Sequence, residues 1–104
     1  MKKQAKNSIL ERTFQANLIK ELKQIFKGCI ILKLDTKYIQ GVPDLLILHK
    51  DKWATLECKK SSTATHRPNQ DHYVNLMNKM SFSRFIYPSN KEEVINDLRK
   101  TFRA

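Results

Sequence analysis

The stretch from Asp44 to Lys59 constrains the fold more than any other part of this sequence. It reads DLLILHKDKWATLECK, which is two apolar segments separated by a short polar one. Asp44–His49 is apolar at nearly every position after its first residue, a pattern typical of a central strand covered on both faces. Trp53–Lys59 also has the composition of a strand, and the intervening HKDK is short enough for a tight turn. We therefore predict an antiparallel β-hairpin.

The second strand of this hairpin has an apolar and a polar face, because side chains two residues apart in a strand share a face. The apolar face consists of Ala54, Leu56 and Cys58. Glu57 and Lys59 lie on the other face, together with Thr55. The short turn limits the register of the two strands. Counting back from the turn places Asp44 close to opposite Glu57.

The remaining apolar positions predict a mixed α/β domain with the element order αβββαβα. Apolar residues recur at three- and four-residue spacings in the helical segments, and branched or aromatic residues mark the strands. Besides the hairpin, the predicted elements are a helix over 8–27 that ends at Gly28, a strand over 30–36, a helix with Pro68 in its first position, a strand over 82–87, and a last helix capped by Ser89 or Asn90. We expect residues 1–104 to form a single domain, with one small sheet flanked by helices.

The chain is strongly basic, with 20 Lys and Arg against 10 Asp and Glu and a formal net charge of +10. This balance favours polyanionic partners such as DNA, RNA or an anionic membrane, although a basic protein without such a partner has the same composition. No apolar run approaches the roughly 20 residues of a membrane span, and no signal-type apolar core follows the basic N-terminus. We expect a cytoplasmic protein that does not use a membrane.

Asp44 and Glu57 form the candidate site. Two adjacent carboxylates raise each other's pKa unless a cation lies between them, and Mg²⁺ or Mn²⁺ suits such a pair because these ions take oxygen ligands. Lys59 could orient a water molecule or neutralise charge on a phosphate. The basic residues expected to hold a polymeric substrate around the site are Lys50, Lys52, Lys60 and Arg67. The alternative is structural: Asp44 in a turn, and Glu57 with Lys59 as an exposed charged pair.

Two polar residues outside the hairpin fit the same site. Glu11 falls on or beside the apolar stripe of the first helix and could join the metal site, but Ser8-x-x-Glu11 also matches a capping box. Gln70 precedes Tyr73 at helical spacing, so we expect it to point toward the sheet. It could bond to the active site or to a phosphate, or it could be a helix-start glutamine with purely local contacts.

The stretch GVPD at Gly41–Asp44, followed by ECK at Glu57–Lys59, resembles the motif of the PD-(D/E)xK nuclease superfamily. The compact element order is most similar to the stand-alone VRR-NUC nucleases of phages and bacteria, and through them to the archaeal-type Holliday-junction resolvases. The resemblance covers nearly the whole chain. One departure is that the glycine-rich stretch usual before PD in those proteins is reduced here to Gly41.

The resemblance implies a restriction-endonuclease-like core and a role for each candidate residue. Asp44 and Glu57 would be metal ligands, joined by the backbone carbonyl of Cys58, and Lys59 would be the catalytic lysine. Glu11 would match the acidic residue that many members carry on the first helix. The glutamine of the VRR-NUC pattern would correspond to Gln70.

From the motif and the charge we expect an endonuclease that uses Mg²⁺, or Mn²⁺ in its place, to hydrolyse DNA. The resemblance implies a homodimer acting on branched DNA in a bacterial or phage-infected cell. Within the same superfamily, a nicking or flap/duplex nuclease is the alternative. From another class, the alternative is a catalytically inactive basic DNA-binding protein on this scaffold. An RNA-binding protein has less support, because the sequence contains no aromatic-basic RNA-reading motif.

Overall fold

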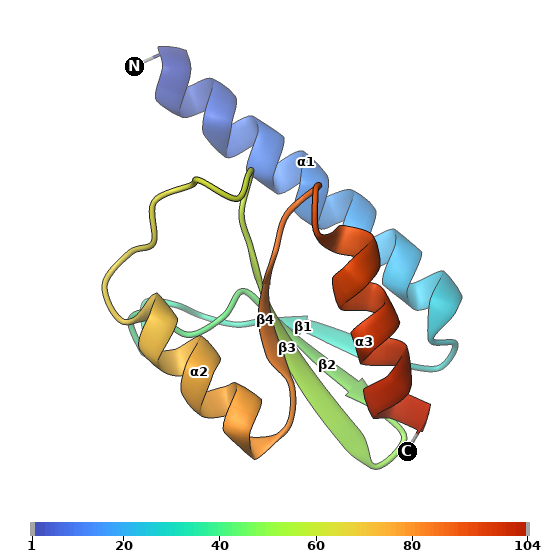
Figure 1. The fold of residues 1–104 in the computed structure, drawn as a ribbon. Coiled ribbons are helices and arrows are strands. Elements are labelled where there is room, and N and C mark those ends of the chain that lie inside the picture. The colour runs from blue at the N-terminus through green and yellow to red at the C-terminus, as the bar shows by residue number, and fades with distance from the viewer. Residues whose placement is uncertain (1, 104) are drawn as a thin grey trace.

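A computed structural model describes the chain from residue 2 to residue 103, with side chains described from residue 10 onward. The elements are α1 (Lys2–Ile25), β1 (Ile30–Lys33), β2 (Leu45–His49), β3 (Lys52–Cys58), α2 (Gln70–Met80), β4 (Ser83–Ile86) and α3 (Lys91–Arg103). The predicted order αβββαβα is therefore confirmed, and residues 2–103 form a small α/β structure with a four-stranded sheet and three helices (Figure 1).

The four strands lie in the order β1-β2-β3-β4, so neighbours in sequence are also neighbours in the sheet. β1 pairs antiparallel with β2, and β2 pairs antiparallel with β3 as the predicted hairpin. Its turn contains Lys50 with a positive φ of 58°. β4 runs parallel to β3, which requires the crossover through α2. The sheet is therefore mixed.

Helices cover the two faces of the sheet unequally. α1 and α3 lie on one face, and α2 lies on the other, as Figure 1 shows. The main core forms between the sheet and the α1–α3 pair, where the predicted apolar face of β3 is buried. Its most deeply buried members include Leu22, Leu45, Ile47, Leu56 and Leu98. This core fixes β2 and β3, the two strands that carry the candidate acids.

Two predictions about helix starts are wrong, and the third agrees with the structure. α1 already begins at Lys2, so Ser8 lies inside the helix and cannot form a capping box with Glu11. α2 begins at Gln70, two residues after Pro68, because Asn69 at its N-cap has a left-handed φ of 70°. α3 begins at Lys91, so Asn90 lies at the predicted N-cap position, and its carbonyl accepts a hydrogen bond from the Val94 N–H. Its side chain accepts a hydrogen bond from the Tyr87 N–H and donates one to the Phe85 carbonyl, which organises the preceding turn.

The sheet is less covered than its sequence suggests. β2 buries Leu45 and Ile47 in the core, but its opposite face is only half-buried, because α2 packs chiefly against β3 and β4. On that face lie the side chains that we call the open apolar face: Ile30, Leu32, Leu46 and Leu48. Ile30 and Leu32 are 56% and 45% exposed. The prediction that both faces of β2 are covered is therefore wrong, and β1 ends at Lys33, three residues before the predicted Thr36.

Among residues 2–103, no helix combines the length and the apolar character that crossing a membrane requires.

Candidate metal-binding active site

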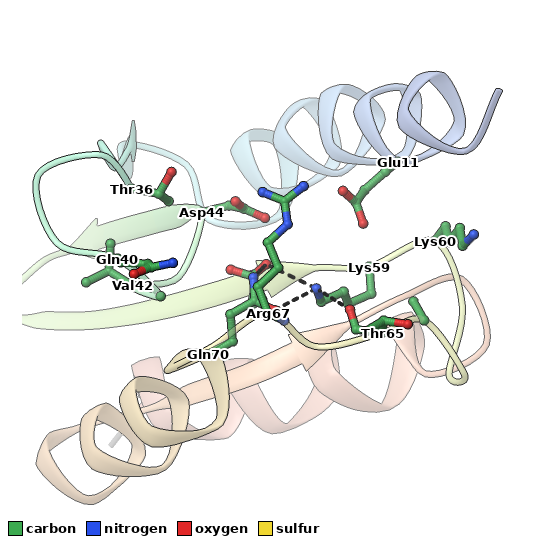
Figure 2. A pocket seen from close by; sticks show the side chains of 13 residues that line it. Glu11, Thr36, Gln40, Val42, Asp44, Lys59, Lys60, Thr65, Arg67 and Gln70 are labelled. Carbon is green, nitrogen blue, oxygen red and sulfur yellow. Dashed lines mark hydrogen bonds and ion pairs between the residues drawn. The ribbon is translucent and has the colours of Figure 1, made fainter. Parts of the chain in front are cut away.

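A pocket of about 770 Å³ lies where the open ends of β2 and β3 meet α1, the start of α2 and the loop between β3 and α2. Figure 2 shows polar side chains from these separate segments converging on it. The candidate residues that line it are Glu11, Asp44, Glu57, Lys59, Lys60, Arg67 and Gln70. The fold thus brings together residues that are far apart in the sequence.

Asp44 and Glu57 face each other across the ends of β2 and β3. Leu45 pairs with Leu56, so the next residues outward are Asp44 and Glu57, as the sequence predicts. The Cys58 N–H donates a hydrogen bond of 3.0 Å to Oδ2 of Asp44, which fixes one oxygen of that carboxylate. Glu57 is only 3% exposed. A buried carboxylate beside a second one requires a compensating group.

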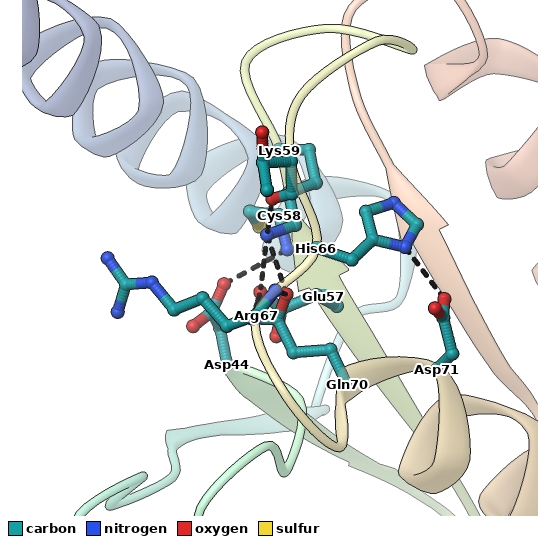
Figure 3. Close-up of polar contacts among 9 residues, drawn as sticks. Asp44, Glu57, Cys58, Lys59, His66, Arg67, Gln70 and Asp71 are labelled. Atoms are coloured by element: carbon teal, nitrogen blue, oxygen red, sulfur yellow. Dashed lines mark hydrogen bonds and ion pairs between the residues drawn. The ribbon is translucent and has the colours of Figure 1, made fainter.

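Lys59 and Gln70 supply part of that compensation through a buried network (Figure 3). The ammonium group of Lys59 donates to Oε1 of Gln70 at 2.7 Å. Nε2 of Gln70 donates to Oε2 of Glu57 at 2.9 Å. Lys59 Nζ lies farther from that oxygen, at 3.9 Å. The amide of Gln70 therefore lies between the Glu57 carboxylate and the Lys59 ammonium group and bonds to both.

The loop before α2 completes the network with main-chain groups. The carbonyl of Thr65 accepts a hydrogen bond of 3.1 Å from Lys59 Nζ. The Arg67 N–H donates to Oε1 of Gln70 at 2.7 Å. Lys59 is only 5% exposed. These contacts exclude the alternative in which Glu57 and Lys59 are an ordinary exposed charged pair.

One oxygen of Glu57 has no partner. Oε1 is buried and accepts no hydrogen bond from any described residue, whereas Oε2 is bonded to Gln70. Burial, followed by the charge of Asp44, raises the pKa of Glu57 to about 8, and the charge of Glu11 adds to this effect. Burial also raises the pKa of Asp44. The pocket therefore favours either a proton or a cation at the unpartnered oxygen.

The chemistry of the donors fits a hard divalent cation. Asp44 and Glu57 offer carboxylate oxygens, and the Cys58 carbonyl is directed to the same side, because the N–H and carbonyl of a strand residue point to one neighbour. Within the described residues, no group of three or more His, Cys, Asp or Glu side chains is placed to hold a metal. Two carboxylates and a main-chain carbonyl are oxygen donors of the kind that Mg²⁺ binds, and this ion takes few protein ligands and keeps several waters.

The other predicted site residues fall into two groups. Glu11 lies on the wall of the pocket, and its part as a metal ligand stays a prediction. Lys60 and Arg67 also line the pocket, and the charge of Arg67 partly offsets the rise that burial causes in the pKa of Asp44.

Lys50 and Lys52 do not surround the site. They lie at the turn of the β2–β3 hairpin, whereas the acids lie at its open end. Five strand residues separate the two ends, which corresponds to about 17 Å. The prediction that these two lysines surround the site is therefore wrong.

Sequence reasoning missed the groups contributed by the loop before α2. It treated SSTATHR as a connection, but Thr65 and Arg67 both bond to site residues. They act through a main-chain carbonyl and a main-chain N–H, which every residue but proline carries, so no residue-type signal could reveal them.

Comparison with models of known protein families finds no family that matches this chain, and comparison with curated proteins finds no relative. A functional assignment therefore depends on the pocket itself and on the motif it carries.

Proposed function

We propose that the protein is a metal-dependent endonuclease that hydrolyses DNA phosphodiester bonds on a restriction-endonuclease-like core. The observation that carries the proposal is the buried pair of acids, Asp44 and Glu57, with one unpartnered carboxylate oxygen and a buried lysine close by. A solubility surface would have no reason to bury these groups, because desolvation of each charge is costly. A site for a cation and a phosphate accounts for all of them.

Asp44, Glu57 and the Cys58 carbonyl would hold Mg²⁺ or Mn²⁺, with Glu11 as a further candidate from the pocket wall. Such an ion, when bound, supplies an acidified water and neutralises charge on the phosphate. The Cys58 N–H keeps Asp44 oriented, and Gln70 keeps Glu57 oriented.

Lys59 contributes a positive charge beside the place where negative charge develops during phosphodiester hydrolysis. Its ammonium group is held by Gln70 and by the Thr65 carbonyl, so its position is fixed before the substrate arrives. Preorganised charges of this kind stabilise a transition state more than mobile ones. Lys60 and Arg67, at the same pocket, would bind the phosphates of the DNA backbone.

The proposed substrate is branched DNA, and the proposed assembly is a homodimer, so that two pockets address two strands. The net charge of +10 supports a polyanionic substrate. The open apolar face supports the dimer, because two strongly basic copies can approach each other most easily through an uncharged surface.

The test incubates the purified protein with labelled four-way junction, flap, duplex and single-stranded DNA in Mg²⁺, in Mn²⁺ and in EDTA. We expect cleavage in both metals, none in EDTA, and the fastest reaction on the junction. Glu57→Gln should abolish cleavage and leave DNA binding nearly intact, because it removes a ligand and keeps the basic surface. Lys59→Ala should cut the rate strongly with little change in metal affinity.

Three outcomes would contradict parts of this proposal. Salt-sensitive DNA binding without cleavage in any divalent ion would identify an inactive DNA-binding protein on this scaffold. Cleavage without preference for the junction would identify a nicking or flap/duplex nuclease. Full activity of Lys59→Ala would exclude the role given to that lysine.

A further inference from the structure

Residues 60–69, which join Lys59 to α2, present two main-chain groups to the pocket, and we call this segment the site loop. The Thr65 carbonyl binds Lys59, and the Arg67 N–H binds Gln70. These two residues flank His66 directly. The position of His66 therefore decides whether both main-chain groups are presented correctly.

The side chain of His66 points away from the pocket, as Figure 3 shows, and is held on two sides. Its ring stacks on the ring of Phe85 with a centroid separation of 4.1 Å and an interplanar angle of 14°. Its Nδ1–H donates a hydrogen bond of 2.7 Å to Oδ1 of Asp71. Phe85 belongs to β4 and pairs with Glu57 in the sheet, and Asp71 follows Gln70 in α2. Both anchors thus sit next to site residues in rigid elements.

The site loop needs such an anchor because most of it is exposed. Residues 65–69 are all exposed, and a loop with few buried contacts samples many conformations. At one end the loop is fixed by Asn69, which packs against Gly41. At its centre, the stack and the hydrogen bond of His66 join it to β4 and to α2.

We propose that His66 is a positioning residue, which clamps the site loop to Phe85 and Asp71 so that Thr65 and Arg67 hold Lys59 and Gln70 in their working orientation. His66 does not line the pocket, so it acts through its two neighbours and not on the substrate. The inference rests on the proposed function where cleavage is the readout, but the order of the loop can be measured without cleavage.

The experiment compares His66→Ala, which removes both contacts, with two variants that each keep one. His66→Phe keeps the stack on Phe85, and His66→Asn keeps a hydrogen-bonding group near the Nδ1 position. His72→Ala is the matched control, because His72 is an exposed histidine on α2 whose ring contacts Tyr73 and not the site loop. The readouts are kcat, KM, melting temperature and hydrogen exchange at the Arg67 amide.

We expect His66→Ala to lower kcat roughly tenfold to a hundredfold, the range expected for a catalytic group that is slightly misplaced. KM should change little, and exchange at the Arg67 amide should accelerate. His66→Phe and His66→Asn should each recover part of both losses, and His72→Ala should match the wild type. The melting temperature should barely move, because the His66–Asp71 pair is partly exposed, with 34% and 67% of the two side chains accessible.

Wild-type kcat together with unchanged Arg67 exchange in His66→Ala would overturn the proposal. So would a higher KM with unchanged exchange, because His66 would then be a DNA contact. If the wild type cleaves no DNA, the proposed function fails, and the exchange rates alone decide the role of His66. If His66→Ala does not fold, Asp71→Ala and the two partial variants give the same comparison.

Discussion

At the scale of single residues, Glu57 is the group least suited to carrying a charge without a cation. It is buried, it faces Asp44, and the one side chain among the described residues that donates a hydrogen bond to it is the neutral amide of Gln70. Lys59 remains at 3.9 Å, too far for a hydrogen bond. The unpartnered Oε1 is where a proton would reside in the metal-free protein. A divalent cation would replace that proton.

This arrangement predicts how stability depends on pH in the absence of metal. The pKa of Glu57 rises from 4.5 to about 8, so the folded state binds the proton more tightly than the unfolded chain. The contribution of Glu57 to the free energy of unfolding is therefore full below pH 4.5, and it is lost as the pH rises through about 8. Urea unfolding in EDTA should therefore show a free energy of unfolding that falls over this range, and Mg²⁺ should restore it at the alkaline end.

Glu57→Gln is the control for this measurement, because the amide has nearly the same shape and does not titrate. The slope of unfolding free energy against pH should be flatter in that variant, and Mg²⁺ should stabilise it less. Equal slopes in the two proteins would show that Glu57 does not dominate the titration.

Gly41 is the second residue with a specific requirement. Its φ is +95°, and a Cβ built on it would lie 2.6 Å from Cβ of Asn69 and 2.7 Å from its backbone carbon. Gly41→Ala should therefore displace Asn69, and with it the start of α2 and Gln70. We expect a loss of roughly 1–3 kcal/mol in stability from the strained backbone. Loss of cleavage should accompany it.

The Gly28→Ala variant separates the effect of backbone strain from the effect of the contact with Asn69. Gly28 has a similar φ of +89°, but a Cβ there meets no atom within 4 Å. The Gly28→Ala variant should lose about as much stability as Gly41→Ala, measured by thermal melting, and it should keep its activity, measured by junction cleavage. If Gly28→Ala lost as much cleavage as Gly41→Ala, backbone strain alone would account for both, and the contact between Gly41 and Asn69 would not matter.

At the scale of elements, the start of α2 controls the site through Gln70. This side chain bonds to Lys59, to Glu57 and to the Arg67 N–H, so it joins β3 to the site loop. Because Gln70 is buried, no water can easily take its place.

Gln70→Ala should therefore let Lys59 and Glu57 approach each other more closely than their present 3.9 Å. We expect weaker Mg²⁺ binding by calorimetry and slower cleavage, together with a loss of about 1–3 kcal/mol in stability for the buried groups left unpaired. Asn75→Ala, at an exposed position of α2, is the matched control and should change none of these quantities. Unchanged Mg²⁺ affinity in Gln70→Ala would show that the amide does not orient Glu57.

The elements also show what the sequence can and cannot predict. The β2–β3 hairpin follows from a continuously apolar strand, a second strand with period-two alternation and a short turn between them, so the meeting of Asp44 with Glu57 could be predicted. The start of α1 could not be predicted from apolar periodicity, because the residues before Ser8 carry no apolar stripe. They continue the helix because most of them are good helix formers. The distance of Lys50 and Lys52 from the site could not be predicted either. Their positive charge indicates a polyanionic partner, but it does not indicate where in the fold these residues lie. The family-level resemblance stays a prediction.

At the scale of the whole molecule, the open apolar face is the surface through which two of these basic chains would associate. Ile30 and Leu32 project from β1, which is an edge strand, and such edges tend to pair with other chains unless they are protected. The proposed homodimer would cover this face.

Leu32→Glu should therefore dissociate the dimer, because burying an unpaired carboxylate against an apolar surface is unfavourable. Sedimentation should show a dimer for the wild type and a monomer for the variant, and the variant should nick a junction without cutting both strands in one event. Leu10→Glu is the control, because Leu10 is a 52% exposed leucine on α1, which covers the other face of the sheet. A monomeric wild type would exclude this arrangement.

The hairpin finally has a consequence for biosynthesis. Asp44 and Cys58 are 14 residues apart, so the two acids can meet as soon as one short stretch has left the ribosome. Gln70 has not yet emerged at that moment, and β4 cannot pair with β3 until the helix between them has been made. If the hairpin forms during that interval, its two acids would lie side by side without their amide donor. Protons and divalent ions in the surrounding solution would then be their first counterparts, before translation ends.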